Sequence, residues 1–460
     1  MAQTLVEKIV SEKIGRQCCI GDFVPKLPVS KMFLNEVLAP PAITYFRKDF
    51  GEVFRELGLP ESVFDPERIF LIPDHTVPSC SIKVSQGVDL MKEFARSTGI
   101  KMFKECDGIE HVILPESGAI VPGDIMIGTD SHTDTNGALN CLAFGVGTTD
   151  AQLAMAGGYL YNFTVPKSIL FKLSGALQDN VCGKDVILYI ISKMGSGGCA
   201  KMVAEFGGEG VRNLSMDDRF TITNMCVEMS ARTGIFPCDE RTEGFMNEVD
   251  SKWDMYKTTL DEGANYERVV EINLSEIEPM ISFPHLPAHA VPISKFDEMA
   301  KRTISSSDPT LAKVVDDSIN FAFIGSCTNG RKSDLIAGAE VLNGKQIHPD
   351  VTLIVIPGSR KIYNWAIDTG IMKIYAEAGA NIQSSNCGTC FGKHMGVLSD
   401  KGRMISTSNR NYQGRMGSKD AQIFLASPAS VASSALTGHI TGPQRNVSRI
   451  KLNNTKIQPK

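Results

Sequence analysis

Three cysteines stand at positions that suit a metal site. Cys327 follows the apolar run of residues 320–326, and Cys387 and Cys390 form a Cys-x-x-Cys pair in SNCGTCFG (385–392). Structural zinc usually takes four ligands, often from a second Cys-x-x-Cys pair, and none is present here. A redox pair normally begins a helix, without a third cysteine at a strand end. Three thiolates suit an iron–sulfur cubane with one iron that lacks a protein ligand, which can act as a Lewis acid. The zinc and redox interpretations stay open at this point.

Acidic residues and histidines gather in a second set of motifs, PDHT (73–76), GIEHV (108–112) and GTDSHTDTNG (128–137). An aspartate at a strand end can orient an imidazole, and histidine moves protons near neutral pH. The alternative is an aspartate or serine that caps a helix beside a histidine that is only hydrogen-bonded. We expect proton transfer by residues from these motifs, namely Asp74, His75, His111, Asp130 and His132.

Two further motifs carry polar side chains of interest. Arg410 and Arg415 lie in SNRNYQGR (408–415), and a guanidinium fork binds a carboxylate through two hydrogen bonds. A solvated loop with scattered charge is the alternative. Asn224 and Glu228 are four residues apart, a spacing that predicts one shared helix face.

Composition narrows the class of protein. The formal net charge of the 460 residues is −5, which argues against a nucleic-acid partner. We find no run of eighteen or more apolar residues and therefore expect no membrane span. The start of the chain, MAQTLVEKIVSEKIG, predicts an amphipathic helix and lacks the pattern of a secretory signal. We therefore expect a cytoplasmic protein whose 12 cysteines are reduced, most of them buried as small apolar side chains.

The elements that position these residues are predicted to be α/β. Short apolar runs that end in a polar residue alternate with helical periods, as in residues 68–74, 124–130, 320–326 and 351–359. Segments 332–344 and 362–379 are helix-like. This alternation predicts α/β layers with largely parallel sheets, and ligands then bind beyond the carboxyl ends of the strands.

Two boundaries divide the chain into three predicted domains. One lies near residues 162–173, where a helical segment gives way to a strand. The other is the proline-rich segment 282–292, whose composition is typical of a linker. The predicted domains are listed by residue as 1–165, 166–290 and 291–460.

The motifs together resemble those of the aconitase superfamily. They are PDHTVPS, GTDSHTDTNGAL, FIGSCTNGR, NCGTCFGKHMG and SNRNYQGRMGS, in family order over most of the chain. Within the superfamily the chain is most similar to the large subunits of 3-isopropylmalate dehydratases. The resemblance implies a hydro-lyase with three aconitase-like α/β/α domains around a [4Fe–4S] cluster, one per chain, held by Cys327, Cys387 and Cys390.

The resemblance also implies roles for the other motif residues. It places Asp74, His75, His111, Asp130, His132 and Glu228 among the catalytic residues. It places Ser131, Asn224, Asn409, Arg410 and Arg415 among the residues that bind substrate or steady the cluster.

A partner follows from the same likeness. The mobile fourth domain of the family has no counterpart here and is expected on a separate small subunit, which supplies the serine base. The expected substrate is a small hydroxy-dicarboxylate, 3-isopropylmalate above all, with 2,3-dimethylmalate and homocitrate chemistry as alternatives. Asn35-Glu36, Asp134, Asn136 and the SSN (384–386) before the cysteine pair depart from the isopropylmalate pattern and leave the substrate open. A regulatory RNA binder is a further alternative, which the net charge and the lack of basic runs disfavour.

Overall fold

The computed structural model describes residues 2–251 and 258–444. The chain divides into two compact units, each made of several segments. Unit 1 comprises Met1–Glu105, Ile113–Ala176 and Gly197–Leu274, and unit 2 comprises Cys106–Val112, Leu177–Ser196 and Ser275–Lys460. We describe each unit by itself.

Unit 1 contains two parallel sheets and a short ribbon. The five-stranded sheet has the order β4-β3-β2-β5-β6, and the four-stranded sheet has the order β10-β9-β8-β11. The strands of the first sheet are β2 (Lys31–Asn35), β3 (Ile69–Ile72), β4 (Lys101–Met102), β5 (Ile125–Gly128) and β6 (Leu142–Gly145). Those of the second are β8 (Ser168–Ser174), β9 (Val203–Gly207), β10 (Thr233–Ile235) and β11 (Arg268–Asn273), and the antiparallel ribbon is β1 (Phe23–Pro28) with β7 (Tyr159–Thr164).

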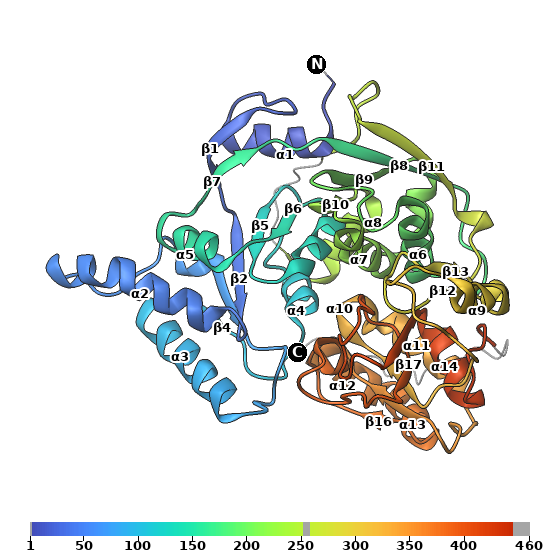
Figure 1. Ribbon diagram of the computed structural model, residues 1–460. Helices are drawn as coiled ribbons and strands as arrows, with labels where there is room; N and C mark the ends of the chain where they lie inside the picture. Colours follow the sequence, from blue (N-terminus) through green and yellow to red (C-terminus); the bar gives the residue numbers. More distant parts are fainter. Residues whose placement is uncertain (1, 252–257, 445–460) are drawn as a thin grey trace. The chain divides into compact units, whose positions relative to one another are not determined.

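Helices cover these sheets. They are α1 (Leu5–Ile14), α2 (Ala39–Glu56), α3 (Ile82–Thr98), α5 (Thr148–Gly157), α7 (Met216–Asn224) and α8 (Glu240–Glu248), with 3-10 segments η1 (Pro66–Arg68), η2 (Ser131–Leu139), η3 (Glu209–Asn213) and η4 (Cys226–Met229). Helices α2 and α3 run side by side, seen in blue in Figure 1, and Phe46 packs edge-on against Phe94 between them with ring centroids 5.7 Å apart. The predicted N-terminal helix is α1. Its first free N–H groups, those of Leu5 and Val6, donate to the buried carboxylate of Glu205 on β9.

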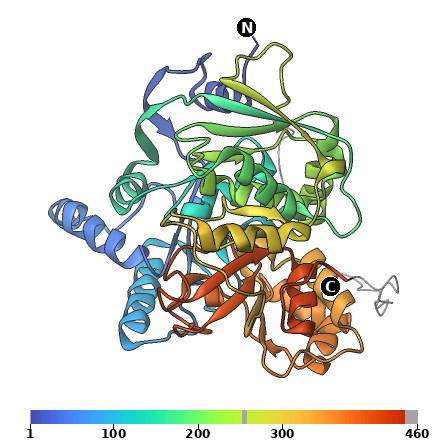
Figure 2. The ribbon, with the colours of Figure 1, turned by 45° about the vertical axis from the view of Figure 1, so that its right-hand side comes forward.

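Unit 2 is built on one seven-stranded sheet of order β13-β12-β18-β17-β14-β15-β16. The strands are β12 (Met280–Ser282), β13 (Ala290–Pro292), β14 (Phe321–Ile324), β15 (Thr352–Val355), β16 (Asn381–Ile382), β17 (Arg403–Ser406) and β18 (Gln422–Ala426). The run from β18 to β16 is parallel, and only the β12–β13 and β12–β18 pairs are antiparallel. Figure 2 shows most of this unit in yellow to red.

The helices of unit 2 lie on this sheet. They are α6 (Gly183–Met194), α9 (Phe296–Ser305), α10 (Ser326–Asn329), α11 (Lys332–Leu342), α12 (Arg360–Asp368), α13 (Ile371–Glu377) and α14 (Pro428–Thr437), with η6 (Ile293–Lys295) and η7 (Gly388–Phe391). The elements α4 (Glu110–Glu116) and η5 (Leu274–Glu276) contain residues of both units. A buried apolar cluster that includes Phe283, Leu353, Phe424 and Val431 forms the core of the unit.

Several expectations can now be compared with the fold. The apolar runs at 68–74, 124–130, 320–326 and 351–359 are strands β3, β5, β14 and β15. The α/β class with largely parallel sheets is therefore confirmed. The three predicted domains stay a prediction, although each block holds one main sheet; residues 445–460 of the last block lie outside the described residues. The proline-rich segment 282–292 contains the last residue of β12, Ser282, and the whole of β13, and both strands belong to the unit 2 sheet.

Two helix predictions were wrong in detail. Segment 362–379 is not one helix, because Gly370 takes a left-handed backbone with φ +83° and separates α12 from α13. Asn224 and Glu228 do not share a helix face, because α7 ends at Asn224 and Glu228 lies on the separate 3-10 segment η4.

No helix among the described residues is both long enough and apolar enough to pass through a membrane.

Candidate functional site

The polar motifs of unit 1 meet at one edge of the five-stranded sheet. Strands β3 and β5 both pair in parallel with β2, so the residues after Asn35, Ile72 and Gly128 leave the sheet at the same edge. The Asp74–His75 turn follows β3, and Asp130 precedes η2 after β5. These positions agree with the expectation that chemistry collects at carboxyl strand ends.

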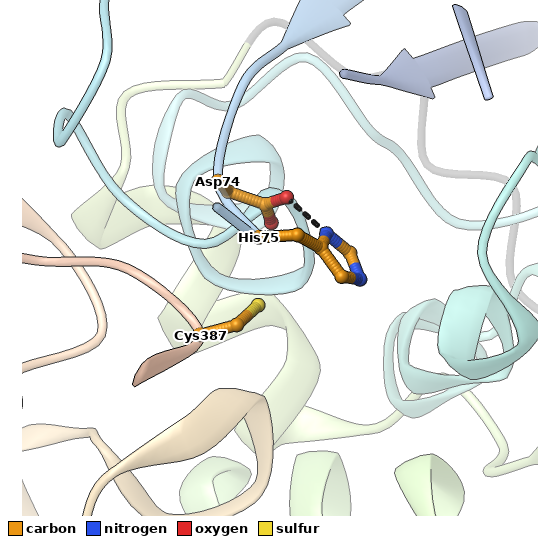
Figure 3. A group of neighbouring side chains, drawn as sticks. All are labelled: Asp74, His75 and Cys387. Atoms are coloured by element: carbon orange, nitrogen blue, oxygen red, sulfur yellow. Dashed lines mark hydrogen bonds and ion pairs between the residues drawn. The ribbon is translucent and has the colours of Figure 1, made fainter. Parts of the chain in front are cut away.

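The side chains form a continuous chain of carboxylates and imidazoles. His75 Nδ1 lies 2.6 Å from Asp74 Oδ1, as Figure 3 shows, and His75 Nε2 lies 3.3 Å from Asp130 Oδ2. The other oxygen of Asp130 lies 3.3 Å from His132 Nδ1, and it accepts from the backbone N–H of His132 at 2.7 Å. His132 Nε2 lies 2.9 Å from Glu228 Oε1. Asp74, His75, Asp130, His132 and Glu228 are therefore linked by direct contacts.

This arrangement changes the acidity of His75. Burial alone favours the neutral ring, but the carboxylates of Asp74 and Asp130 outweigh it and raise the pKa of His75 well above its usual value. His75 consequently keeps its proton to a higher pH than an ordinary imidazole does.

Glu36 fixes the backbone of the Asp74–His75 turn. Its buried carboxylate accepts hydrogen bonds from the N–H groups of Asp74 and His75, each at 2.9 Å, and from both the N–H and the hydroxyl of Thr76. Charge-assisted bonds to three consecutive N–H groups leave this turn little freedom. The sequence offered a signal for Glu36, an acidic residue directly after an apolar strand, but we considered it only as a departure from the family pattern.

The other departures, Asp134 and Asn136, are fully buried inside unit 1. Asp134 Oδ2 accepts from the N–H of Val227, which ties η2 to η4 beside Glu228. Asn136 donates to the carbonyl of Thr133 within η2. Asn224 donates to the hydroxyl of Thr135 at 2.7 Å. These three side chains thus brace the segments that carry His132 and Glu228.

The three cysteines lie at the carboxyl edge of the unit 2 sheet. Cys327 follows β14, whereas Cys387 and Cys390 follow β16, and both strands pair in parallel with β15. All three side chains are buried, and none forms a disulfide. Gly388 stands between the pair with φ +56°, and a Cβ at that position would lie 2.3 Å from Cδ1 of Ile356. Only glycine therefore fits this turn without displacing Ile356.

Asn409 joins two of the sulfurs. Its Nδ2 donates to Cys327 Sγ at 3.4 Å, and its Oδ1 accepts from Cys390 Sγ at 3.3 Å. The sulfurs of Cys327 and Cys390 thus face the same small amide, although the residues are far apart in sequence. Asn409 lies on the loop that follows β17.

The two predicted arginines lie further along this loop. The guanidinium of Arg410 lies over the ring of Tyr412, 6.0 Å from its centroid. That of Arg415 lies over the ring of Phe391, 5.8 Å from its centroid. Among the described residues, the buried Nε of Arg415 has no hydrogen-bond partner.

A buried lysine that we did not predict also reaches this loop. Lys184, on the first turn of α6, is fully buried, and burial lowers its pKa to about 8. Its Nζ donates to the carbonyls of Thr407 and Ser408, each at 2.6 Å. The sequence offered no signal for it, because a single lysine in GKDVIL has the pattern of an ordinary helix start.

His111 belongs to unit 2 and is buried on α4. Its Nε2 lies 3.6 Å from Glu110 Oε1, and its carbonyl accepts from Arg331 Nη2 at 3.0 Å. The backbone N–H of Arg331 in turn donates to Asp334 near the start of α11. Ser131, in unit 1, places its hydroxyl 3.4 Å from His132 Nδ1.

Comparison with known proteins identifies the family. Residues 7–438 match the model of the "Aconitase family (aconitate hydratase)". The chain belongs to the aconitase family.

Curated members of the aconitase family are similar over almost the whole length. The "3-isopropylmalate dehydratase large subunit" of Thermoanaerobacter sp. (strain X514) is 43% identical over 96% of this chain and 99% of its own. "3-isopropylmalate dehydratase large subunit 1" of Pyrococcus furiosus is 42% identical over 96% and 99%, and the corresponding Aquifex aeolicus protein is 41% identical over 97% and 98%. The predicted family and enzyme class, a hydro-lyase of the aconitase family, are confirmed.

Proposed function

We propose that this chain is the large subunit of a 3-isopropylmalate dehydratase and interconverts 2- and 3-isopropylmalate by removing and adding water. The observation that carries the proposal is the likeness, at 41 to 43% identity and nearly full length, to large subunits with that name. The alternatives from the sequence, 2,3-dimethylmalate and homocitrate chemistry, rested on Asn35-Glu36, Asp134, Asn136 and the SSN (384–386) before the cysteine pair. Each of Glu36, Asp134 and Asn136 forms a hydrogen bond that braces its own segment of unit 1, and this structural role does not depend on the identity of the substrate.

Cys327, Cys387 and Cys390 are the residues that would hold a [4Fe–4S] cluster. The fit of these residues to the cluster is good: three buried thiols, no disulfide, and one amide placed against two of the sulfurs. Three thiolates leave one iron without a protein ligand, and that iron supplies a Lewis acid for the substrate hydroxyl and carboxylate.

The chain's own residues supply the proton chemistry in this proposal. Hydroxide is a poor leaving group unless an acid protonates it, and Asp74 and Asp130 raise the pKa of His75 and so favour its protonated, acid form. The contact of His132 with Glu228 offers a second route for protons. As in the sequence analysis, His111 is proposed as a catalytic residue and Ser131 as a residue that binds substrate.

Substrate carboxylates would be held by arginines. The buried Nε of Arg415 without a partner suits a carboxylate, which an arginine fork can bind through two hydrogen bonds. Arg410 is the second candidate, and Asn224 keeps its predicted role next to the substrate. Negative charge that builds at the carboxylate during proton removal is then stabilised.

A small subunit is the proposed partner, since the relatives named above are large subunits. The small subunit would supply the serine base and would contribute residues that recognise the substrate side chain. We expect the chain alone to turn over no substrate.

Steady-state kinetics on a panel of substituted malates tests the assignment. The chain is reconstituted without oxygen, combined with the small subunit encoded by the same organism, and supplied with 3-isopropylmalate, 2,3-dimethylmalate, homocitrate and citrate. The proposal predicts the highest kcat/KM for 3-isopropylmalate and no turnover by either subunit alone. A higher kcat/KM for another malate would replace the substrate, and no turnover of any of the four would overturn the proposed function.

A further inference from the structure

Lys184 is a buried charge that the proposed proton chemistry does not use. Its side chain is fully buried on the first turn of α6 (Gly183–Met194). An ammonium group is removed from water at a cost of several kcal/mol unless nearby groups compensate it. A lysine in this position therefore calls for a compensating partner.

The hydrogen bonds of Lys184 lead to the cysteine loop. Nζ donates to the carbonyls of Thr407 and Ser408, the two residues directly before Asn409. Asn409 in turn contacts the sulfurs of Cys327 and Cys390. Lys184 thus holds the backbone from which the amide of Asn409 reaches both sulfurs.

The titratable groups that act electrostatically on Lys184 are mostly thiols. Both carbonyl acceptors are neutral, and among the described residues no carboxylate lies within ion-pair distance of Nζ. The groups that act on its charge are Cys182, Cys390 and Cys327, followed by the carboxylate of Asp334. Two of the three thiols are proposed cluster ligands, which carry a negative charge once they bind iron.

We propose that Lys184 is a positioning residue for the cluster, whose ammonium offsets the negative charge of the Cys327 and Cys390 thiolates and fixes the loop that carries Asn409. The inference rests on the proposed function, because it assumes a cluster at these cysteines. Net charge and hydrogen bonds around an iron–sulfur cluster set its reduction potential. A positive charge nearby favours the reduced cluster, so its loss makes reduction harder.

The test compares three variants of the holoenzyme. Lys184→Gln keeps a hydrogen-bond donor but removes the charge, whereas Lys184→Arg keeps the charge. Lys193→Gln, on the exposed side of the same helix, is the matched control. Iron and acid-labile sulfide are counted first, and the midpoint potential of the bound cluster is then measured by a redox titration followed by electron paramagnetic resonance.

We expect Lys184→Gln to shift the midpoint potential to a more negative value, with Lys184→Arg and Lys193→Gln close to wild type. An unchanged potential in Lys184→Gln with an intact cluster would overturn the proposal. So would a Lys184→Gln chain that fails to fold before any iron is added, because Lys184 would then serve the fold and not the cluster. A wild-type chain that binds no cluster contradicts the proposed function itself, which separates the two failures.

Discussion

At the scale of single residues, the contact of Asp130 with two histidines is the feature that most directly links geometry to chemistry. One carboxylate lies 3.3 Å from His75 Nε2 and 3.3 Å from His132 Nδ1. The negative charge of Asp130, together with that of Asp74, favours the protonated form of His75. Asp130 therefore contributes, with Asp74, to the pH up to which His75 keeps its proton.

Asp130→Asn should lower the pKa of His75, since it removes the charge but keeps an oxygen that can accept from His132 N–H. The measurement is a nuclear magnetic resonance titration of the histidine rings, with Asp150→Asn as an exposed control. The pKa of His75 is higher in the folded protein than the value of about 6.5 expected in the unfolded chain. Protonation of this ring therefore stabilises the fold fully at a pH below the unfolded pKa, and the stabilisation is lost as the pH rises through the folded pKa. In Asp130→Asn, the folded pKa of His75 is lower, so this stabilisation should be lost at a lower pH than in the wild type. A His75 pKa that does not fall would contradict the account.

Glu36→Gln should slow turnover without removing any group that touches the substrate. The variant loses one of the two oxygens that accept from the Asp74–Thr76 backbone, so His75 is held less firmly. A misplaced catalytic group costs on the order of a hundredfold in rate, and we expect kcat to fall by roughly ten- to a hundredfold with a smaller change in KM. Kinetics of the reconstituted pair measure this, with Glu56→Gln on the exposed end of α2 as control. Equal kcat values in the two variants would exclude a positioning role for Glu36.

At the scale of elements, the turn between Cys387 and Cys390 depends on a glycine. Gly388 combines a left-handed backbone with a close approach to Ile356, whereas Gly344 has a similar φ of +70° and nothing within 4 Å. The two positions thus separate the cost of backbone strain from the cost of a clash.

Gly388→Ala should destabilise unit 2 more than Gly344→Ala does and should reduce iron uptake. The left-handed backbone alone costs about 1–2 kcal/mol for an alanine, and Gly388→Ala adds the displacement of Ile356. Thermal unfolding of the apo chains and iron content after reconstitution give the two readouts. If both variants unfold alike and bind iron alike, the close packing at Gly388 is not what shapes the cysteine turn.

Elements were predicted well where local pattern decides them and less well where a single residue interrupts them. The apolar strands β3, β5, β14 and β15 followed from short runs that end in a polar residue. The break at Gly370 and the end of α7 at Asn224 did not follow, because a helical period continues across both in the sequence. The signal available in the sequence was the glycine itself, because glycine often ends a helix by adopting a left-handed conformation.

At the scale of the whole molecule, motifs that are distant in the sequence come together within each unit, but the sequence did not show which residues support them. Cys327, Cys387 and Cys390 were proposed together from the Cys-x-x-Cys pair, a third cysteine after an apolar run and the family resemblance, and the structure places all three after parallel strands of one sheet. Lys184 was missed, because its importance lies in complete burial and in contacts more than two hundred residues away. Glu36 was named from the sequence, but its role was not predicted. The backbone N–H groups that bind its carboxylate belong to residues about forty positions later, and no sequence pattern around Glu36 indicates them.

The central claim, an open-site cluster on Cys327, Cys387 and Cys390, is tested most directly by counting iron and acid-labile sulfide in the anaerobically reconstituted chain. We predict about four of each per chain, falling to about three iron on brief oxidation. Cys387→Ser should fold but lose the cluster, whereas Cys19→Ser, an exposed cysteine in unit 1, should match wild type. Zinc in place of iron, no bound metal, or full iron content in Cys387→Ser would contradict the claim.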